Sequence, residues 1–86
     1  MPEVSRFFGI VIRMYYDEHM PPHFHALYAG HEVEVAIDPI AVHQGSLSQR
    51  ALSMVIEWAA LHQRELLTNW ERLRHDKPIT KIDPLD

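Results

Sequence analysis

The first third of the chain has the apolar pattern of a buried β-strand followed by a polar break. Residues 7–16 are rich in aromatic and β-branched side chains, and they are apolar on both alternating positions as far as Arg13. Such a run is typical of a strand that is covered on two sides. Residues 17–22 interrupt it, because two consecutive prolines there remove two backbone donors.

Two further strands are predicted immediately after this break. Residues 23–28 and 32–38 both carry apolar side chains at alternate positions, and Ala29-Gly30 between them has the composition of a hairpin turn. The pair Asp38-Pro39 ends the second of these strands. Residues 41–44 predict a short fourth strand that ends at Gly45.

The second half of the chain has helical spacing. Ser46 and Gln49 have the spacing of a capping box, which predicts a helix that starts at Ser46 and continues to about His75. Periodicity alone leaves open whether this is one long helix or two consecutive helices that meet near His62. Pro78 ends the helical pattern, and residues 79–82 predict an additional edge strand.

Residues 51–61 are apolar on nearly every side of the predicted helix, whereas residues 62–75 are apolar on one side only. A helix that is apolar all round has to be covered on two sides. The sheet covers one side, and we expect a homodimer or another protein partner to cover the other. The residues predicted for that interface are Ala51, Met54, Trp58 and Leu61.

These elements predict an α+β fold, with a three- to four-stranded, mainly antiparallel sheet packed against one long or two consecutive C-terminal helices. Eighty-six residues form a single domain, residues 1–86. The hydrophobic content of 47% is that of an ordinary globular protein. The absence of cysteine excludes disulfides, thiolate metal sites and cysteine nucleophiles, and it is typical of a cytoplasmic protein.

The net charge of the chain and the length of its apolar runs indicate which partners, nucleic acid or membrane, are unfavourable. The formal net charge is −4. A molecule with net negative charge is not attracted as a whole to the phosphates of nucleic acid. The apolar run at the N-terminal end is far too short to cross a bilayer, so no membrane association is expected. No cofactor is predicted from the sequence, and a divalent metal ion that the histidines could bind is the alternative.

The predicted hairpin places two histidines beside acidic residues. Side chains alternate between the faces of a strand, so His23 and His25 share the face opposite to Phe24. If the apolar residues of both strands face the core, Glu32 and Glu34 share the histidine face. A two-residue turn puts His25 directly opposite Glu34, with Cβ atoms about 4.5–5.5 Å apart.

Three interpretations of this face remain open. In the first, His23 and His25 bind a metal with a further ligand from His19, Asp17 or Glu34.

In the second interpretation, His23 and His25 are general acid and base in the cleavage of a phosphodiester, oriented by Asp17 or Glu34, while Arg13 contacts phosphate. In the third, the histidines and glutamates are an ordinary polar sheet surface, in which each opposed pair stabilises the fold by roughly 0.2–1 kcal/mol.

Two stretches of the sequence carry a resemblance to a known family. These are PPHFHA at residues 21–26 and EWAALHQRELLTNWE at residues 57–71, and the similarity extends over essentially the whole chain. The sequence resembles the bacterial domain-of-unknown-function 4160 family. Ser48 stands where members of that family often have proline at the start of the helix.

The resemblance implies a role that the residues themselves do not show. Members of this family are described as toxin components of type II toxin–antitoxin modules, paired with a second domain-of-unknown-function family, numbered 2442. By resemblance, the chain would bind a cognate antitoxin protein and inhibit growth when free, and it would act on nucleic acid if the histidines are catalytic. The alternative is a non-catalytic protein- or metal-binding module.

Overall fold

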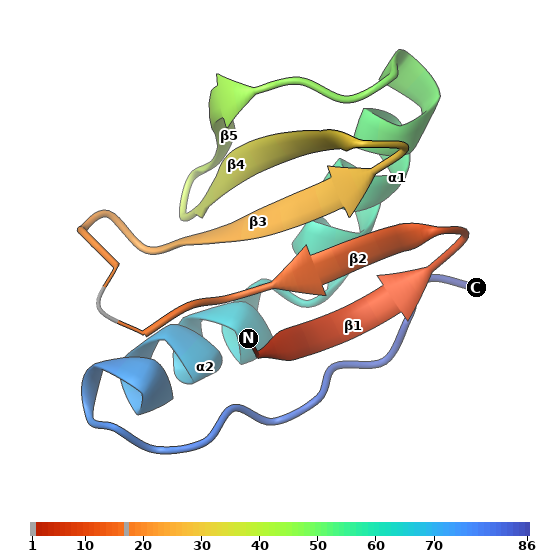
Figure 1. Ribbon diagram of the computed structural model, residues 1–86. Coiled ribbons are helices and arrows are strands. Elements are labelled where there is room, and N and C mark those ends of the chain that lie inside the picture. Colours follow the sequence, from red (N-terminus) through yellow and green to blue (C-terminus); the bar gives the residue numbers. More distant parts are fainter. Residues whose placement is uncertain (1, 17) are drawn as a thin grey trace.

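The chain folds into a five-stranded antiparallel sheet with two helices against one face. The computed structural model describes residues 2–16 and 18–86. Strands adjacent in sequence are adjacent in the sheet, and every neighbouring pair is antiparallel (Figure 1). The elements are β1 (Glu3–Phe7), β2 (Ile10–Arg13), β3 (His23–Tyr28), β4 (His31–Ile37), β5 (Ile40–Gly45), α1 (Gln49–Leu61) and α2 (Gln63–Arg74). The predicted α+β class is confirmed.

The prediction of three or four strands is wrong, because residues 7–16 do not form one strand. Phe8 and Gly9 have φ angles of 51° and 80°, which turn the chain between β1 and β2. Two consecutive residues with positive φ are characteristic of the tightest hairpin turns. Ala29 and Gly30, with φ angles of 52° and 80°, make the predicted turn between β3 and β4. An apolar residue at the first turn position concealed the earlier hairpin from the sequence pattern.

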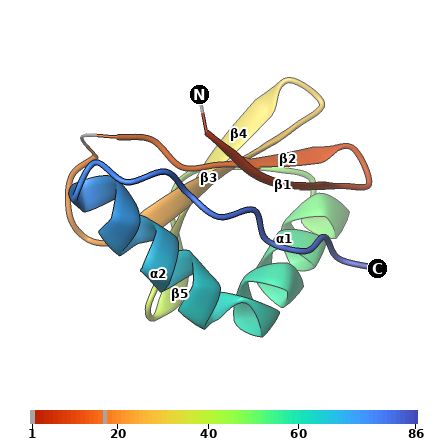
Figure 2. The same cartoon turned by 90° about the horizontal axis from the view of Figure 1, so that it is seen from below.

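The hydrophobic core lies between one face of the sheet and the two helices, which both run beneath that face (Figure 2). Phe24 and Ala26 of β3 are fully buried, as are Val33 and Val35 of β4. The helices contribute fully buried Val55, Trp58, Ala59 and Leu66. The inward face of the hairpin is therefore the one that the alternation of apolar residues predicted.

The helical half consists of two consecutive helices. Periodicity had left open whether residues 46–75 form one helix or two. Helix α1 ends at Leu61 and α2 begins at Gln63, with His62 between them at φ −121° and ψ 22°. The predicted N-cap at Ser46 is wrong. The hydroxyl of Ser48 accepts the hydrogen bond from the Ala51 N–H at 3.2 Å. In the part of the chain that the structure describes, no helix is long and apolar enough to span a bilayer.

The C-terminal tail, residues 75–86, does not form the predicted edge strand. The N–H of Ile82 donates to the carbonyl of Val4 in β1 at 2.9 Å, and the tail runs beside β1 (Figure 1). Upstream of that bond, the backbone N–H and carbonyl of Thr80 are both occupied by the side chain of Asn69, each at 2.8 Å. A backbone paired with a side chain is not free to extend a sheet, so the tail remains irregular.

This tail also covers the second side of α1. Trp58 is fully buried, its indole N–H donates to the Asp83 carbonyl at 2.8 Å, and its ring lies 5.5 Å from that of Phe7. Ala51 is likewise buried within the chain. Of the interface residues predicted from sequence, Leu61 is 67% exposed. The tail and Phe7 therefore cover Trp58 within the chain, and a partner that contacts Leu61 stays a prediction.

We expect the tail to contribute measurably to stability through Ile82. Replacing this 5% exposed side chain with alanine should lower the free energy of unfolding by about 2 kcal/mol, the lower end for an isoleucine in a core. Leu61→Ala, at an exposed position, serves as the control and should change it by less than about 0.5 kcal/mol. Urea unfolding monitored by tryptophan fluorescence measures both. Equal stability of Ile82→Ala and the wild type would contradict this role.

Candidate metal centre

The strand register brings the histidines and acidic residues together as predicted. His25 lies directly opposite Glu34, and His23 lies opposite Ala36. The side chains, however, do not contact their direct neighbours. The Nδ1 atom of His25 lies 2.9 Å from Oε2 of Glu32, while Glu34 lies 4.0 Å from Nε2 of His23 and 3.8 Å from Nδ1 of His43. The strand register was predictable from the sequence. The side-chain conformations that bring His25 to Glu32 instead of Glu34 were not.

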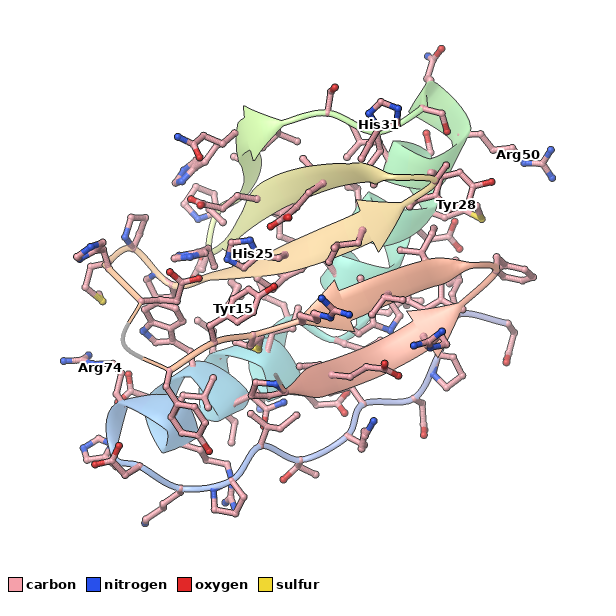
Figure 3. All side chains as sticks on the ribbon, in the orientation of Figure 1. Tyr15, His25, Tyr28, His31, Arg50 and Arg74 are labelled. Carbon is pink, nitrogen blue, oxygen red and sulfur yellow. The ribbon has the colours of Figure 1, made fainter. Side chains whose placement is uncertain are left out.

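The histidine face is covered rather than open to water, contrary to the sequence-based expectation. The side chains of His23 and His25 are only 5% and 13% exposed. The ring of Tyr15 lies edge-on to His25 with centroids 4.7 Å apart, and the two lie beside one another in Figure 3. Trp70 of α2 approaches His23 with ring centroids 5.2 Å apart. Two aromatic rings therefore shield the imidazoles from solvent.

His23 has a defined tautomer and a free lone pair. Its Nδ1 atom lies 2.8 Å from the carbonyl oxygen of Pro21. A carbonyl oxygen only accepts hydrogen bonds, so Nδ1 carries the hydrogen and Nε2 of a neutral ring carries the lone pair. Nε2 is buried and has no hydrogen-bond partner among the residues that the structure describes. An unpaired polar atom in such a position is costly unless another group satisfies it.

His25 lies between two carboxylates. In addition to Glu32 at Nδ1, Oε1 of Glu18 lies 2.5 Å from its Nε2 atom. A neutral imidazole has only one N–H, so it cannot donate to both carboxylates. Both contacts are satisfied if the ring is protonated, or if a bound cation takes the place of the hydrogen between Nε2 and Glu18.

The carboxylate of Glu18 joins the two histidines. Its Oε1 atom lies 3.3 Å from Nε2 of His23, and the potential ligand atoms of Glu18, His23 and His25 all lie within 4.8 Å of one another. Ligand atoms around a tetrahedral ion with bonds of about 2.0–2.1 Å are roughly 3.3 Å apart. The three side chains therefore have the composition of a three-ligand site for a divalent metal. The Glu18–His23 pair has the matching spacing, whereas Glu18 and His25, 2.5 Å apart, would have to separate slightly to admit an ion.

The other residues predicted for this site have different positions. His19 is exposed and does not belong to the group. Asp17 lies outside the described residues. Arg13 lies opposite His25 in the register of β2 and β3, but the described contacts include no hydrogen bond or ion pair between Arg13 and this cluster. Glu34 lies at the periphery, between His23 and His43.

Sequence reasoning missed the residue that connects the cluster. Glu18 lies in the connection between β2 and β3, where no periodicity indicates the direction of a side chain. The only signal was its inclusion in the acidic and histidine-rich stretch at residues 17–25. Glu32 was assigned to the correct face, but it was not predicted as the partner of His25.

The environment of Glu18 favours its ionised form. Partial burial opposes ionisation of the carboxyl, but the hydrogen bond to His25 and the proximity of His23 outweigh this effect. The pKa of Glu18 therefore lies below its ordinary value. An ionised carboxylate is the form that binds metal cations.

Comparison with known proteins identifies the family but no activity. The model of the family described as "Domain of unknown function (DUF4160)" matches residues 9–71, so the chain belongs to this family. No curated protein and no solved structure matches the chain.

The lowered pKa of Glu18 predicts a pH-dependent contribution to the stability of metal-free protein. A carboxyl group with a depressed pKa in the folded state stabilises it above the unfolded-state value, here 4.5, and this contribution is lost as the pH falls through the folded pKa. Glu18→Gln should therefore be less stable than the wild type at pH 7, and the difference should decrease below pH 4.5.

Urea unfolding in the presence of a chelator, measured between pH 7 and pH 3, tests this prediction. Glu57→Gln is the matched control, because Glu57 is an exposed carboxylate of α1 outside the cluster. A difference between the wild type and Glu18→Gln that stays constant over this pH range would contradict it.

Proposed function

We propose that this member of the family is a metalloprotein that holds one divalent transition-metal ion with Glu18, His23 and His25. One observation carries the proposal. The buried Nε2 atom of His23 has its lone pair free and its other nitrogen bonded to a carbonyl, and it lies 3.3 Å from a carboxylate. Two lone pairs that face each other in a shielded site are unfavourable, and either a proton on Nε2 or a metal cation between the two atoms removes the repulsion.

The charges around the site also favour a cation. Three carboxylates, Glu18, Glu32 and Glu34, lie within 4.0 Å of His23 or His25. If the histidines are neutral, this cluster has an excess of negative charge that a divalent ion offsets. Metal binding requires neutral imidazoles and ionised carboxylates, and the lowered pKa of Glu18 meets the second requirement.

The donor set indicates the class of metal and its chemistry. Two imidazoles and one carboxylate suit zinc and other first-row ions, and three protein ligands leave a coordination position for water or a substrate. Such an ion, when bound, acts as a Lewis acid and lowers the pKa of a coordinated water to about 7. The Pro21 carbonyl on His23 and the Glu32 carboxylate on His25 are the outer partners that orient the ligand rings.

We expect the wild type, freed of metal by a chelator, to bind one equivalent of Zn²⁺ or Co²⁺ per chain in isothermal titration calorimetry. His23→Ala should weaken binding by more than about 100-fold, because it removes a ligand. Glu32→Gln should weaken it by about 10–100-fold, the usual effect of an outer partner. His75→Ala changes an exposed histidine at the end of α2 and should leave binding unchanged.

The circular dichroism spectra of the variants must match the wild type for this comparison to be valid. Binding of equal strength by the wild type and by His23→Ala would exclude the site. The complete absence of binding to the folded wild type would exclude the metalloprotein proposal altogether.

A second proposal follows from the position of His25 and from the family resemblance. Glu32 orients the His25 ring at Nδ1, at 2.9 Å, and the ring has the arrangement of an oriented general base once a substrate takes the place of Glu18 at Nε2. This contact supports a metal-independent acid–base site in a toxin component that binds an antitoxin and acts on nucleic acid. The cluster itself offers no phosphate contact, because no ion pair or hydrogen bond joins it to Arg13 among the described residues.

Expression in a bacterial host tests the second proposal. The toxin role predicts growth arrest by the wild type and normal growth with His25→Ala at equal protein levels, while His31→Ala, an exposed histidine at the opposite end of the hairpin, remains toxic. Normal growth with the wild type would exclude toxicity in that host. Arrest by His25→Ala as well would exclude His25 as the source of the toxicity.

A further inference from the structure

A pocket of about 250 Å³ adjoins the candidate metal centre on the Glu18 side. It is lined by Tyr15, Glu18, Trp70, Leu73, Arg74 and Asp76. Three of these residues belong to the metal centre or contact it: Glu18 is a proposed ligand, Tyr15 lies against His25, and Trp70 lies against His23. A molecule in this pocket would therefore contact the proposed ligand Glu18 and the two rings that pack against His23 and His25.

Arg74, whose guanidinium could pair with an anion, is among the residues that line the pocket. Arg74 lies at the end of α2, and Figure 3 shows its side chain on the same side of the molecule as Tyr15 and His25. The guanidinium is only loosely paired, since its nearest carboxylate is that of Glu71 at 3.6 Å and both side chains are more than half exposed. A guanidinium has five donors in a planar fork that matches the oxygens of carboxylate and phosphate groups.

Metal binding makes the charge around this pocket less negative. Glu18 and Asp76 outnumber Arg74 among the charged residues that line it, so the metal-free pocket has a net negative charge. A divalent ion on Glu18 outweighs this single negative charge of the lining residues, although Glu32 and Glu34 remain within 4.0 Å of the proposed histidine ligands. Glu32 and Glu34 do not line this pocket, because they face a separate hollow with His25, Gln44 and Gly45.

We propose that this pocket binds a small oxyanion, which completes the coordination of the metal at one end and is held by Arg74 at the other. The proposal rests on the metalloprotein function proposed above and names the class of its ligand. The pocket is slightly smaller than the roughly 300–1,000 Å³ of typical ligand sites, so it suits a small phosphate- or carboxylate-bearing molecule. Without metal, the charges repel such a ligand.

The visible absorption spectrum of the Co²⁺-loaded protein tests this proposal. Inorganic phosphate and acetate, titrated separately at constant ionic strength, distinguish the two kinds of oxyanion, and at least one of them should change the cobalt bands in a saturable manner. Arg74→Gln should bind Co²⁺ as tightly as the wild type and bind the anion at least 10-fold more weakly. Arg64→Gln, on the same helix and outside the pocket, should bind both as the wild type does.

The outcomes separate the two proposals. Failure of the wild type to bind Co²⁺ overturns the metal centre, and the anion site with it. Normal Co²⁺ binding with no spectral response to either anion overturns the anion site alone. A response that is equal in the wild type and in Arg74→Gln refutes the assignment of the anion to this pocket. Equal anion binding to metal-free protein, measured by calorimetry, refutes the role of the metal.

Discussion

The pairing of β3 with β4 is the constraint on which both the core and the candidate site depend. Ala29 and Gly30, with positive φ angles, fix this pairing so that His25 lies opposite Glu34. Because side chains alternate along a strand, a slip of one residue would exchange the two faces of a strand. Such a slip would expose Phe24 or Val35, both fully buried, and the hydrophobic cost makes it unfavourable. The core thus determines the register, and the register in turn gathers histidines and glutamates on the other face.

A polar sheet face binds ions more strongly when it is shielded from bulk water. In this protein, two aromatic rings from different elements shield the histidines. Tyr15 reaches His25 from the connection after β2, and Trp70 reaches His23 from α2. The position of α2 is supported at Asn69, whose buried side chain bonds to both backbone groups of Thr80 in the tail. Shielding lowers the local dielectric and strengthens every electrostatic interaction within the cluster. A cation is therefore more strongly favoured here than on an open sheet surface with the same residues.

The sequence was informative wherever a regular element fixed the direction of side chains. Alternation and the Ala29-Gly30 turn predicted the hairpin, its buried face and the position of His25 opposite Glu34. The Phe8-Gly9 turn was missed because a bulky apolar residue rarely takes a positive φ angle. The course of the tail depends on tertiary hydrogen bonds, which leave no periodic signal. Residues 75–86 cover Trp58 of α1 within the chain, while a partner at the exposed Leu61 stays a prediction.

The same distinction explains why Glu18, rather than a residue of a strand, escaped prediction. The two histidines are held rigidly by β3, whereas Glu18 belongs to a connection without regular structure. Its carboxylate nevertheless approaches both rings, at 2.5 Å and 3.3 Å. A cation that binds all three side chains joins this connection to the sheet, so part of its binding free energy stabilises the folded state of the connection. In a domain of 86 residues, with a correspondingly small core, such a link between the metal and the fold adds to the stability that hydrophobic burial provides.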